Sequence, residues 1–189
     1  MKATKTFILF FILHSSFFIL AGCTDKKTTE SATDVDSLSD EITVKDSAIY
    51  GTVGKGTAMH MLELVDENGK KKSYQYNVNV ETNVQGGLFS GDRITAVLTS
   101  TENGEQEVMK TVNLTSLCGK WTALDKNFEI IEDGTVISTK NMESNPYTHW
   151  SMINCNLVLN RDTFDVLYVG PDSLTIENKK GIFVYKRQR

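Results

Sequence analysis

Apolar and polar residues alternate with a period of two along most of this 189-residue chain from residue 48 onward, and turn residues interrupt the alternation at short intervals. Such alternation is typical of strands that bury one face. No ten-residue segment of residues 116–189 has a helical period, and the chain contains only two prolines, Pro146 and Pro171. The pattern predicts an all-β protein.

The first block, residues 47–115, contains five segments rich in β-branched and aromatic residues. They span residues 48–54, 57–65, 72–80, 93–100 and 105–114. Asn68-Gly69 and Asn103-Gly104 predict tight type I′ hairpin turns, in which both central residues have positive φ. Five short strands over about 70 residues predict a small barrel or sandwich of the OB type. Residues 81–92 would form the long connection before its fourth strand.

The second block, residues 116–189, contains eight shorter segments of the same kind. They span residues 119–124, 128–132, 135–139, 149–153, 156–160, 164–169, 173–177 and 182–186. Consecutive short strands with tight turns predict an up-and-down meander that closes into a barrel. An eight-stranded barrel is narrow, so we expect a packed interior or a shallow pocket.

The N-terminus has the layout of a secretory signal peptide. Lys2 and Lys5 precede an apolar run at residues 7–20, which is shorter than the ~20 residues that span a bilayer. Cys23 directly follows Leu-Ala-Gly, and this arrangement resembles the bacterial lipobox. We therefore expect residues 1–22 to be removed and Cys23 to be lipidated.

Residues 23–46 are expected to be the lipidated cysteine and a flexible tether, because Thr, Ser, Asp, Glu and Lys dominate this stretch. The expected location is the cell envelope. The residues after Cys23 include Asp25-Lys26-Lys27, a poor match to the acidic signals that take some gut-bacterial lipoproteins to the cell surface. We expect an outer-membrane protein that faces the periplasm.

Charge and motifs exclude several functions. Without residues 1–22 the chain keeps 18 of its 20 basic residues against 24 acidic ones, and its longest basic run is Lys70–Lys72. Nucleic-acid binding needs a clustered basic face, so we exclude it. The sequence has no Gly-x-Ser-x-Gly, His-Glu-x-x-His, P-loop or dinucleotide motif. We expect a non-catalytic protein without a cofactor.

His60 and its neighbours are the remaining metal candidates. In a strand, Met59 and Met61 would point away from His60, whereas a soft-metal site needs convergent ligands. We expect no metal site, and we expect His60 to be half-buried on the same face as Leu62 and Leu64.

Gly119-Lys120-Trp121 resembles the Gly-x-Trp signature of lipocalins, whose Trp closes one end of the barrel against a basic side chain of the last strand. The resemblance implies that Gly119 and Trp121 close the barrel with Arg187 or Lys186 as a cation–π partner. Further matching residues are Asn127–Glu129, Asp133-Gly134, Trp150 and Tyr185–Arg187. Together they resemble the lipocalin-like domain of two-domain envelope lipoproteins from gut anaerobic bacteria.

The first block resembles the other domain of the same family through Ile49–Thr52, Gly56-Thr57, Met59 and Gly91–Arg93. The resemblance therefore covers most of the chain after residue 22. The second block is about half as long as lipocalins that hold a ligand in a deep cup, and a fold does not fix a function.

Tyr147, His149 and Trp150 are the candidate ligand-binding residues of the second block. Aromatic faces stack on sugars and flat apolar ligands, and His supplies hydrogen bonds. The alternative is that Trp150 belongs to the core and Tyr147 caps an end of the barrel.

Cys118 and Cys155 have two interpretations. They can form a disulfide in an oxidising compartment, or they can be buried free thiols. The sequence does not separate these alternatives.

The expected function is the binding of a small apolar or sugar-like molecule, or of an envelope protein, through the lipocalin-like domain. The alternative is a structural or accessory subunit of an envelope complex with no ligand of its own.

Overall fold

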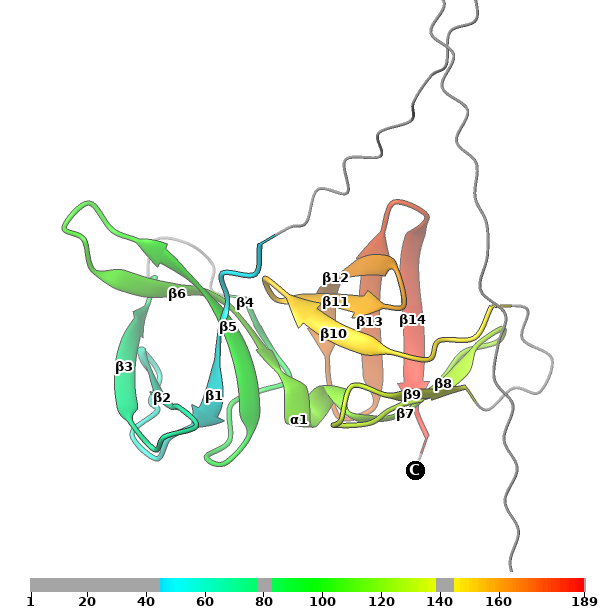
Figure 1. Ribbon diagram of the computed structural model, residues 1–189, viewed down its shortest axis with the longest axis horizontal. Coiled ribbons are helices and arrows are strands. Elements are labelled where there is room, and N and C mark those ends of the chain that lie inside the picture. Colours follow the sequence, from blue (N-terminus) through cyan, green and yellow to red (C-terminus); the bar gives the residue numbers. More distant parts are fainter. Residues whose placement is uncertain (1–44, 78–82, 139–144, 189) are drawn as a thin grey trace, which may run out of the picture. The chain divides into compact units, whose positions relative to one another are not determined.

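The computed structural model describes residues 45–77, 83–138 and 145–188. In these residues fourteen strands and one short helix, α1 (Leu114–Leu117), form a six-stranded and an eight-stranded sheet. Figure 1 shows the two sheets one after the other along the chain, both within the compact unit Ile42–Arg189. The all-β prediction is confirmed. The expected signal peptide, Cys23 and most of the expected tether lie outside the described residues.

The first sheet closes into a five-stranded barrel. Its strands are β1 (Ile49–Val53), β2 (Met61–Val65), β3 (Lys71–Tyr76), β5 (Arg93–Ser100) and β6 (Gln106–Asn113). β1 pairs with β2 and β5, β2 pairs with β3, β5 pairs with β6, and a parallel pairing of β3 with β6 closes the ring. This closed barrel of five strands is the OB-like barrel that the sequence predicts.

Alternating side chains fill the first barrel. On β2, Leu62 and Leu64 are buried, whereas Glu63 between them is only partly covered. The buried residues of this core are Val53, Leu62, Leu64, Tyr74, Tyr76, Ile94, Ala96 and Val108. Gly51 permits the close approach of β1 to β2, because a β-carbon there would lie 2.6 Å from the carbonyl oxygen of Val65.

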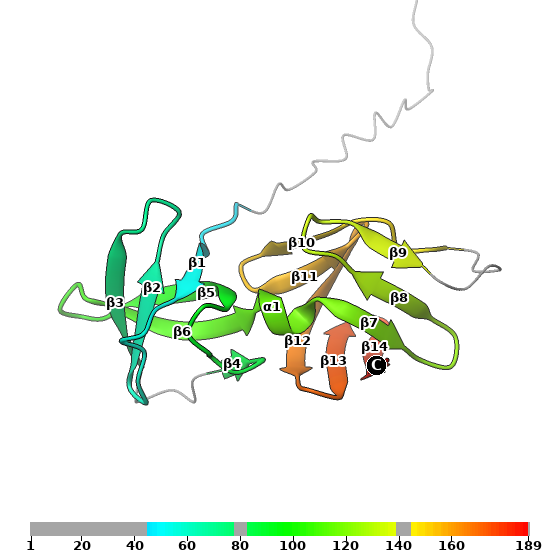
Figure 2. The same cartoon turned by 90° about the horizontal axis from the view of Figure 1, so that it is seen from below.

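The sequence did not predict strand β4 (Asn83–Gln85) within the expected connection. β4 pairs in parallel with β6 outside the ring of five strands. It lies between β6 and the end of a strand of the second sheet (Figure 2), where the backbone N–H of Val169 donates to Gln85 Oε1 at 3.3 Å. The short helix α1 was also unpredicted; Asn113 caps its start by accepting a hydrogen bond from Ser116 N at 2.8 Å.

The second sheet is an antiparallel meander in which the last strand returns to the first. Its strands are β7 (Gly119–Thr122), β8 (Asn127–Ile130), β9 (Val136–Ser138), β10 (Trp150–Ile153), β11 (Asn156–Leu159), β12 (Asp162–Val169), β13 (Ser173–Asn178) and β14 (Gly181–Arg187). β14 pairs with β7, and Val136 N donates to Thr148 O at 2.9 Å across the remaining seam. The predicted eight-stranded up-and-down barrel is confirmed as a nearly closed sheet.

Large side chains fill the inside of the eight-stranded sheet. Those with at most 2 % exposure include Trp121, Phe128, Ile130, Leu157, Leu159, Phe164, Val166, Leu174, Ile176 and Tyr185. Aromatic rings meet edge to face, as in the pair of Phe128 and Tyr185 with centroids 5.0 Å apart. The space that a lipocalin uses for a ligand is occupied here by side chains.

The predicted hairpins form, but the predicted turn type is wrong. Gly69 and Gly104 have positive φ, whereas the preceding Asn68 and Asn103 do not. Asp66 N donates to Lys70 O at 3.0 Å and Gly69 N to Asp66 O at 2.9 Å. This pattern is a three-residue loop that ends in a glycine bulge, which needs only one residue with positive φ.

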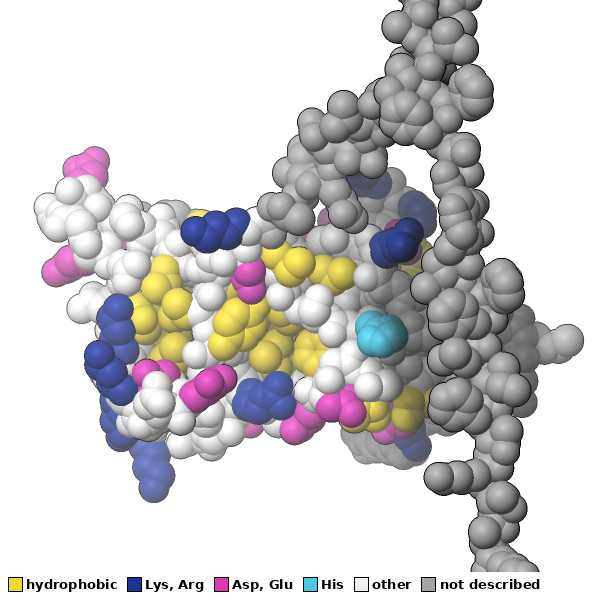
Figure 3. Space-filling view, in the orientation of Figure 1, with side chains coloured by type: hydrophobic (Ala, Val, Ile, Leu, Met, Phe, Trp, Pro, Cys, Tyr) yellow, Lys and Arg dark blue, Asp and Glu magenta, His cyan; other side chains and the backbone are white. Residues whose placement is uncertain are grey.

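The β10–β11 hairpin tip lies against the first sheet. Tyr50 on β1 donates to the carbonyl of Met152 at 3.0 Å, and Asn154 Nδ2 donates to Lys45 O at 3.0 Å. Figure 3 shows hydrophobic side chains on this face, over β1 and β5 and toward the tip of that hairpin. The contacts tie the start of the described chain to the second sheet.

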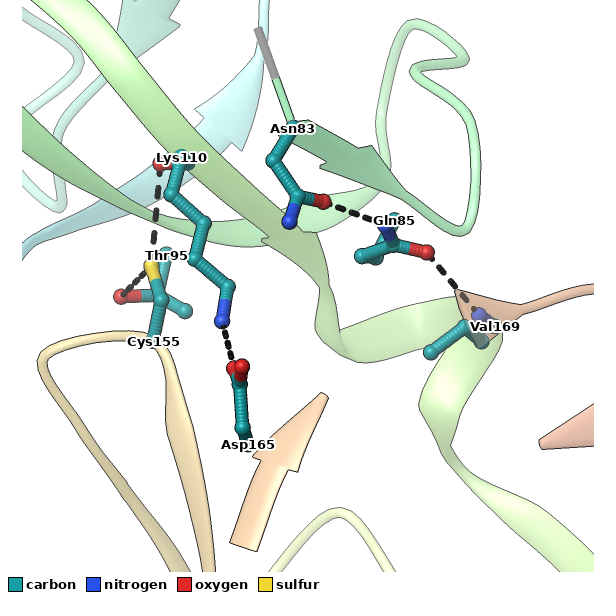
Figure 4. Close-up of polar contacts among 7 residues, drawn as sticks. All are labelled: Asn83, Gln85, Thr95, Lys110, Cys155, Asp165 and Val169. Carbon is teal, nitrogen blue, oxygen red and sulfur yellow. Dashed lines mark hydrogen bonds and ion pairs between the residues drawn. The ribbon is translucent and has the colours of Figure 1, made fainter. Parts of the chain in front are cut away.

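Two further groups of polar contacts join the sheets (Figure 4). Lys110 of β6 forms an ion pair with Asp165 of β12, and its side chain is only 15 % exposed. Cys155 Sγ lies 3.9 Å from Thr95 Oγ1 and 3.7 Å from the carbonyl oxygen of Lys110. Leu114 and Leu117 of α1 add apolar contact, because they belong to the same core cluster as the second sheet.

Candidate binding pocket

Trp121 and Arg187 meet at one end of the eight-stranded sheet. The Arg187 guanidinium carbon lies 4.1 Å from the centre of the Trp121 ring. Trp121 is 1 % exposed, and its indole N–H donates to Leu117 O at 2.9 Å. The structure thus brings together the residues that the lipocalin resemblance selects, with Arg187 rather than Lys186 on the ring.

Gly119 and two carbonyl groups fix the position of the Arg187 guanidinium. Nη1 donates to Cys118 O at 2.9 Å, and Nη2 donates to Ser116 O. Gly119 has φ +129°, and a β-carbon there would lie 2.6 Å from Arg187 Nη1. Glycine is therefore needed both for the backbone conformation and for room beside the guanidinium.

Beside this contact lies a pocket of about 630 Å³, which we call the Arg187 pocket. Its lining residues are Val84, Gln85, Gly86, Gly87, Phe89, Ser116, Tyr168, Val169, Gly170, Pro171 and Arg187. Phe89 is 73 % exposed and Tyr168 is 48 % exposed, so both aromatic side chains are accessible. The pocket therefore offers apolar surface close to one fixed cation.

Strand β4 and the glycines after it form one wall of the pocket. The carbonyl of Gly86 accepts hydrogen bonds from Ser116 Oγ at 2.8 Å and from Asn113 Nδ2 at 3.3 Å. Gly86 has φ +91°, and a β-carbon there would lie 2.7 Å from Asn113 Cβ. This close contact positions the segment that carries Phe89.

The turn between β12 and β13 forms the opposite wall. Val169, Gly170 and Pro171 line the pocket, and Gly170 N donates to Ser173 O at 2.8 Å to close the turn. The hydrogen bond from Val169 N to Gln85 Oε1 connects this wall to β4. Both walls therefore belong to hydrogen-bonded strands and turns.

Tyr147, His149 and Trp150 do not share an accessible surface. Tyr147 is 7 % and Trp150 is 8 % exposed, and the Trp150 indole N–H donates to Ile131 O at 2.6 Å. His149 is exposed, with Nδ1 2.9 Å from Thr148 Oγ1. The structure places the two aromatic residues in the core, as in the alternative interpretation of this cluster.

Tyr147 also lines a smaller pocket of about 360 Å³ at the opposite end of the eight-stranded sheet. Phe164, another lining residue, is only 2 % exposed. Lys126 Nζ lies 4.0 Å from the centre of the Tyr147 ring and covers one of its faces. Phe183, the third aromatic lining residue, is partly buried, so none of the three aromatic residues here is as exposed as Phe89 or Tyr168 in the Arg187 pocket.

Cys118 and Cys155 are both free, so the disulfide alternative is not the arrangement in this structure. Cys155 is fully buried and Cys118 is half-buried. Burial raises the pKa of both thiols. A buried, protonated thiol packs as a small apolar group.

His60 is exposed, which corrects the expectation of a half-buried packing residue. β2 begins only at Met61, and Ala58 N donates to Met61 O at 2.8 Å in a turn that contains His60. His60 therefore lies in the turn before β2, although the apolar alternation predicts a strand over residues 57–65 that includes it. Among the described residues no group of three or more His, Cys, Asp or Glu side chains could hold a metal ion.

Comparison of the chain with family models, curated proteins and solved structures finds no match. In the part of the chain that the structure describes, no helix has both the length and the apolar character that crossing a membrane requires.

The sequence did not predict Phe89 and Tyr168 as pocket residues, or Gln85 as the residue that connects the two walls of the pocket. Gly86-Gly87 with Phe89 two residues later was an available signal, but turn residues over 81–92 predict only a connection. Tyr168 occupies an outward-facing position of β12, where a sequence pattern alone predicts only solvent contact.

Proposed function

We propose that this protein is a non-catalytic, lipid-anchored envelope protein that binds a ligand in the Arg187 pocket. One observation carries the proposal: side chains fill the eight-stranded sheet, whereas the exposed Phe89 and Tyr168 line an accessible pocket of about 630 Å³. Small-molecule sites have volumes of roughly 300–1,000 Å³ and a largely apolar lining with a few polar groups.

The composition of the pocket supports binding over catalysis. Its described lining residues include no His, Cys, Asp, Glu or Lys side chain. The Ser116 hydroxyl donates its hydrogen bond to the carbonyl of Gly86, which is not a base. A nucleophile needs an adjacent base or a lowered pKa, and the described lining offers neither.

Cys23 supports the envelope location through its position after Leu-Ala-Gly. A lipid on Cys23 would hold both sheets at the outer membrane, on its periplasmic side. A Cys23→Ala variant should leave the membrane fraction after a carbonate wash. Retention of that variant in the membrane would contradict the lipid anchor.

The pocket is tested with 2-naphthamide, an uncharged flat apolar probe, titrated calorimetrically into the full chain. A Phe89→Ala/Tyr168→Ala double variant should weaken binding at least tenfold, because it removes the two exposed aromatic surfaces. Met59→Ala is the matched control, since Met59 is 86 % exposed and does not line the pocket. Equal binding by the double variant and the control would contradict the proposed site.

The alternative function, an accessory subunit without a ligand, is favoured by the outer face of β14. Ile182 is 61 % and Val184 is 58 % exposed on this strand. If this face contacts an envelope partner, an Ile182→Lys/Val184→Lys variant should lose a cross-linked complex that the unaltered chain forms in its membrane. An unchanged complex would leave the Arg187 pocket as the better-supported site.

A further inference from the structure

Arg187 is a partly buried cation, and no carboxylate of the described residues lies at contact distance from its guanidinium. Its guanidinium donates to the carbonyls of Cys118 and Ser116 and stacks on Trp121. Within the described residues no carboxylate forms an ion pair with it inside 4.0 Å. Burial lowers the pKa of Arg187 and the more distant charge of Asp172 opposes that shift. Arginine nevertheless stays charged in proteins.

The guanidinium also has unused donor capacity. Arginine carries five N–H groups, and the two hydrogen bonds to carbonyls use two of them. Arg187 is the only charged side chain among the described residues that line the pocket. A partly buried cation with free donors is stabilised by an anionic oxygen, and hydrogen bonds between ions are stronger than neutral ones.

We propose that the ligand of the Arg187 pocket carries a carboxylate group, which binds the Arg187 guanidinium, on a flat apolar body that packs against Phe89 and Tyr168. This inference rests on the proposed binding function and adds the chemical class of the ligand. Trp121 and the two carbonyls hold the guanidinium in place, so the anion meets a preorganised donor. Little side-chain entropy is lost on binding to such a group.

The test compares 2-naphthoate with 2-naphthamide, which share the apolar body and differ in charge. Both are titrated into the full chain by calorimetry in the same buffer. We expect naphthoate to bind about tenfold to a hundredfold more tightly, the range for a hydrogen bond to a charged group. Equal affinities would overturn the ligand class and leave the pocket itself standing, because naphthamide binding tests the pocket separately.

Variants of Arg187 assign the difference to this side chain. Arg187→Gln should remove the preference for naphthoate, and Arg187→Lys should keep part of it because the charge remains. Lys186→Gln is the matched control, since Lys186 is exposed on the same strand and does not line the pocket. A preference that persists in Arg187→Gln would overturn the proposal. If Arg187→Gln does not fold, the proposal is tested by the affinities of the two ligands for the unaltered chain and for Arg187→Lys.

Binding of neither naphthyl compound to the unaltered chain would overturn the ligand class and the proposed pocket together. Binding of naphthoate alone would support both. The two probes together therefore distinguish an error about the carboxylate of the ligand from an error about the Arg187 pocket as a binding site.

Discussion

At the scale of single residues, Gly119 determines whether Arg187 can reach Trp121. Its φ of +129° belongs to a region that L-residues rarely adopt, and the guanidinium occupies the space of its missing side chain. Gly181 offers a comparison on the same sheet, because its φ is +137° and nothing lies within 4 Å of a β-carbon there. A substitution of Gly181 therefore measures backbone strain alone, whereas a substitution of Gly119 adds a steric conflict with Arg187.

We predict that Gly181→Ala lowers the free energy of unfolding by about 1–3 kcal/mol through backbone strain alone. Gly119→Ala should cost about 1 kcal/mol more, because the guanidinium must leave two carbonyls and the Trp121 ring. Urea unfolding followed by tryptophan fluorescence measures both. Equal losses would mean that Arg187 moves aside freely and that its position is not fixed by Gly119.

The residues of the barrel end could be selected from sequence through the resemblance of Gly119-Lys120-Trp121 to the lipocalin signature, which left Arg187 and Lys186 as alternatives. The Arg187 pocket could not. Phe89 lies in a loop and Tyr168 on an outward-facing strand position. Their segments meet because β4, which pairs with β6, also lies beside the end of β12. Contacts between segments that are distant in sequence are not visible in the local alternation of apolar and polar residues.

At the scale of elements, most strand positions apart from β4 followed from alternation and turn residues, whereas turn geometry did not. Asn-Gly indicates a hairpin, but the same dipeptide fits both a two-residue type I′ turn and the end of a three-residue loop. The two-residue loop with two positive φ values is instead Asn154-Cys155, at +51° and +59°. Cysteine carries no turn signal, so the sequence could not predict this hairpin type.

The turn geometry makes opposite predictions for two neighbouring residues. Gly104→Ala should destabilise the protein by about 1–2 kcal/mol, because φ at this position is +79°. Asn103→Ala should change stability by no more than about 0.5 kcal/mol, since Asn103 is not among the described residues with positive φ. Thermal unfolding measures both. A comparable loss for Asn103→Ala would instead indicate the type I′ turn.

At the scale of the whole described region, the two sheets share stabilising contacts. Leu117 of α1 is fully buried in the core cluster of the second sheet, although α1 directly follows the last strand of the first. The Lys110–Asp165 ion pair and the Val169–Gln85 hydrogen bond connect the same sheets. Elements that share a core tend to unfold cooperatively.

We therefore predict a single unfolding transition for both sheets. Leu117→Ala should lower the free energy of unfolding by about 2–5 kcal/mol through loss of buried apolar contact. Trp121 and Trp150 report on the second sheet by fluorescence, and hydrogen exchange of the β2 and β3 amides reports on the first. Both signals should shift together in the variant.

Leu124→Ala is the matched control for Leu117→Ala. Leu124 is 98 % exposed, so its removal should change stability by no more than about 0.5 kcal/mol. A variant in which fluorescence shifts but the β2 and β3 amides keep their protection would show that the first sheet is stable on its own. The helix would then be a linker between independent domains, and the Arg187 pocket, which takes residues from both sheets, would open and close with their relative motion.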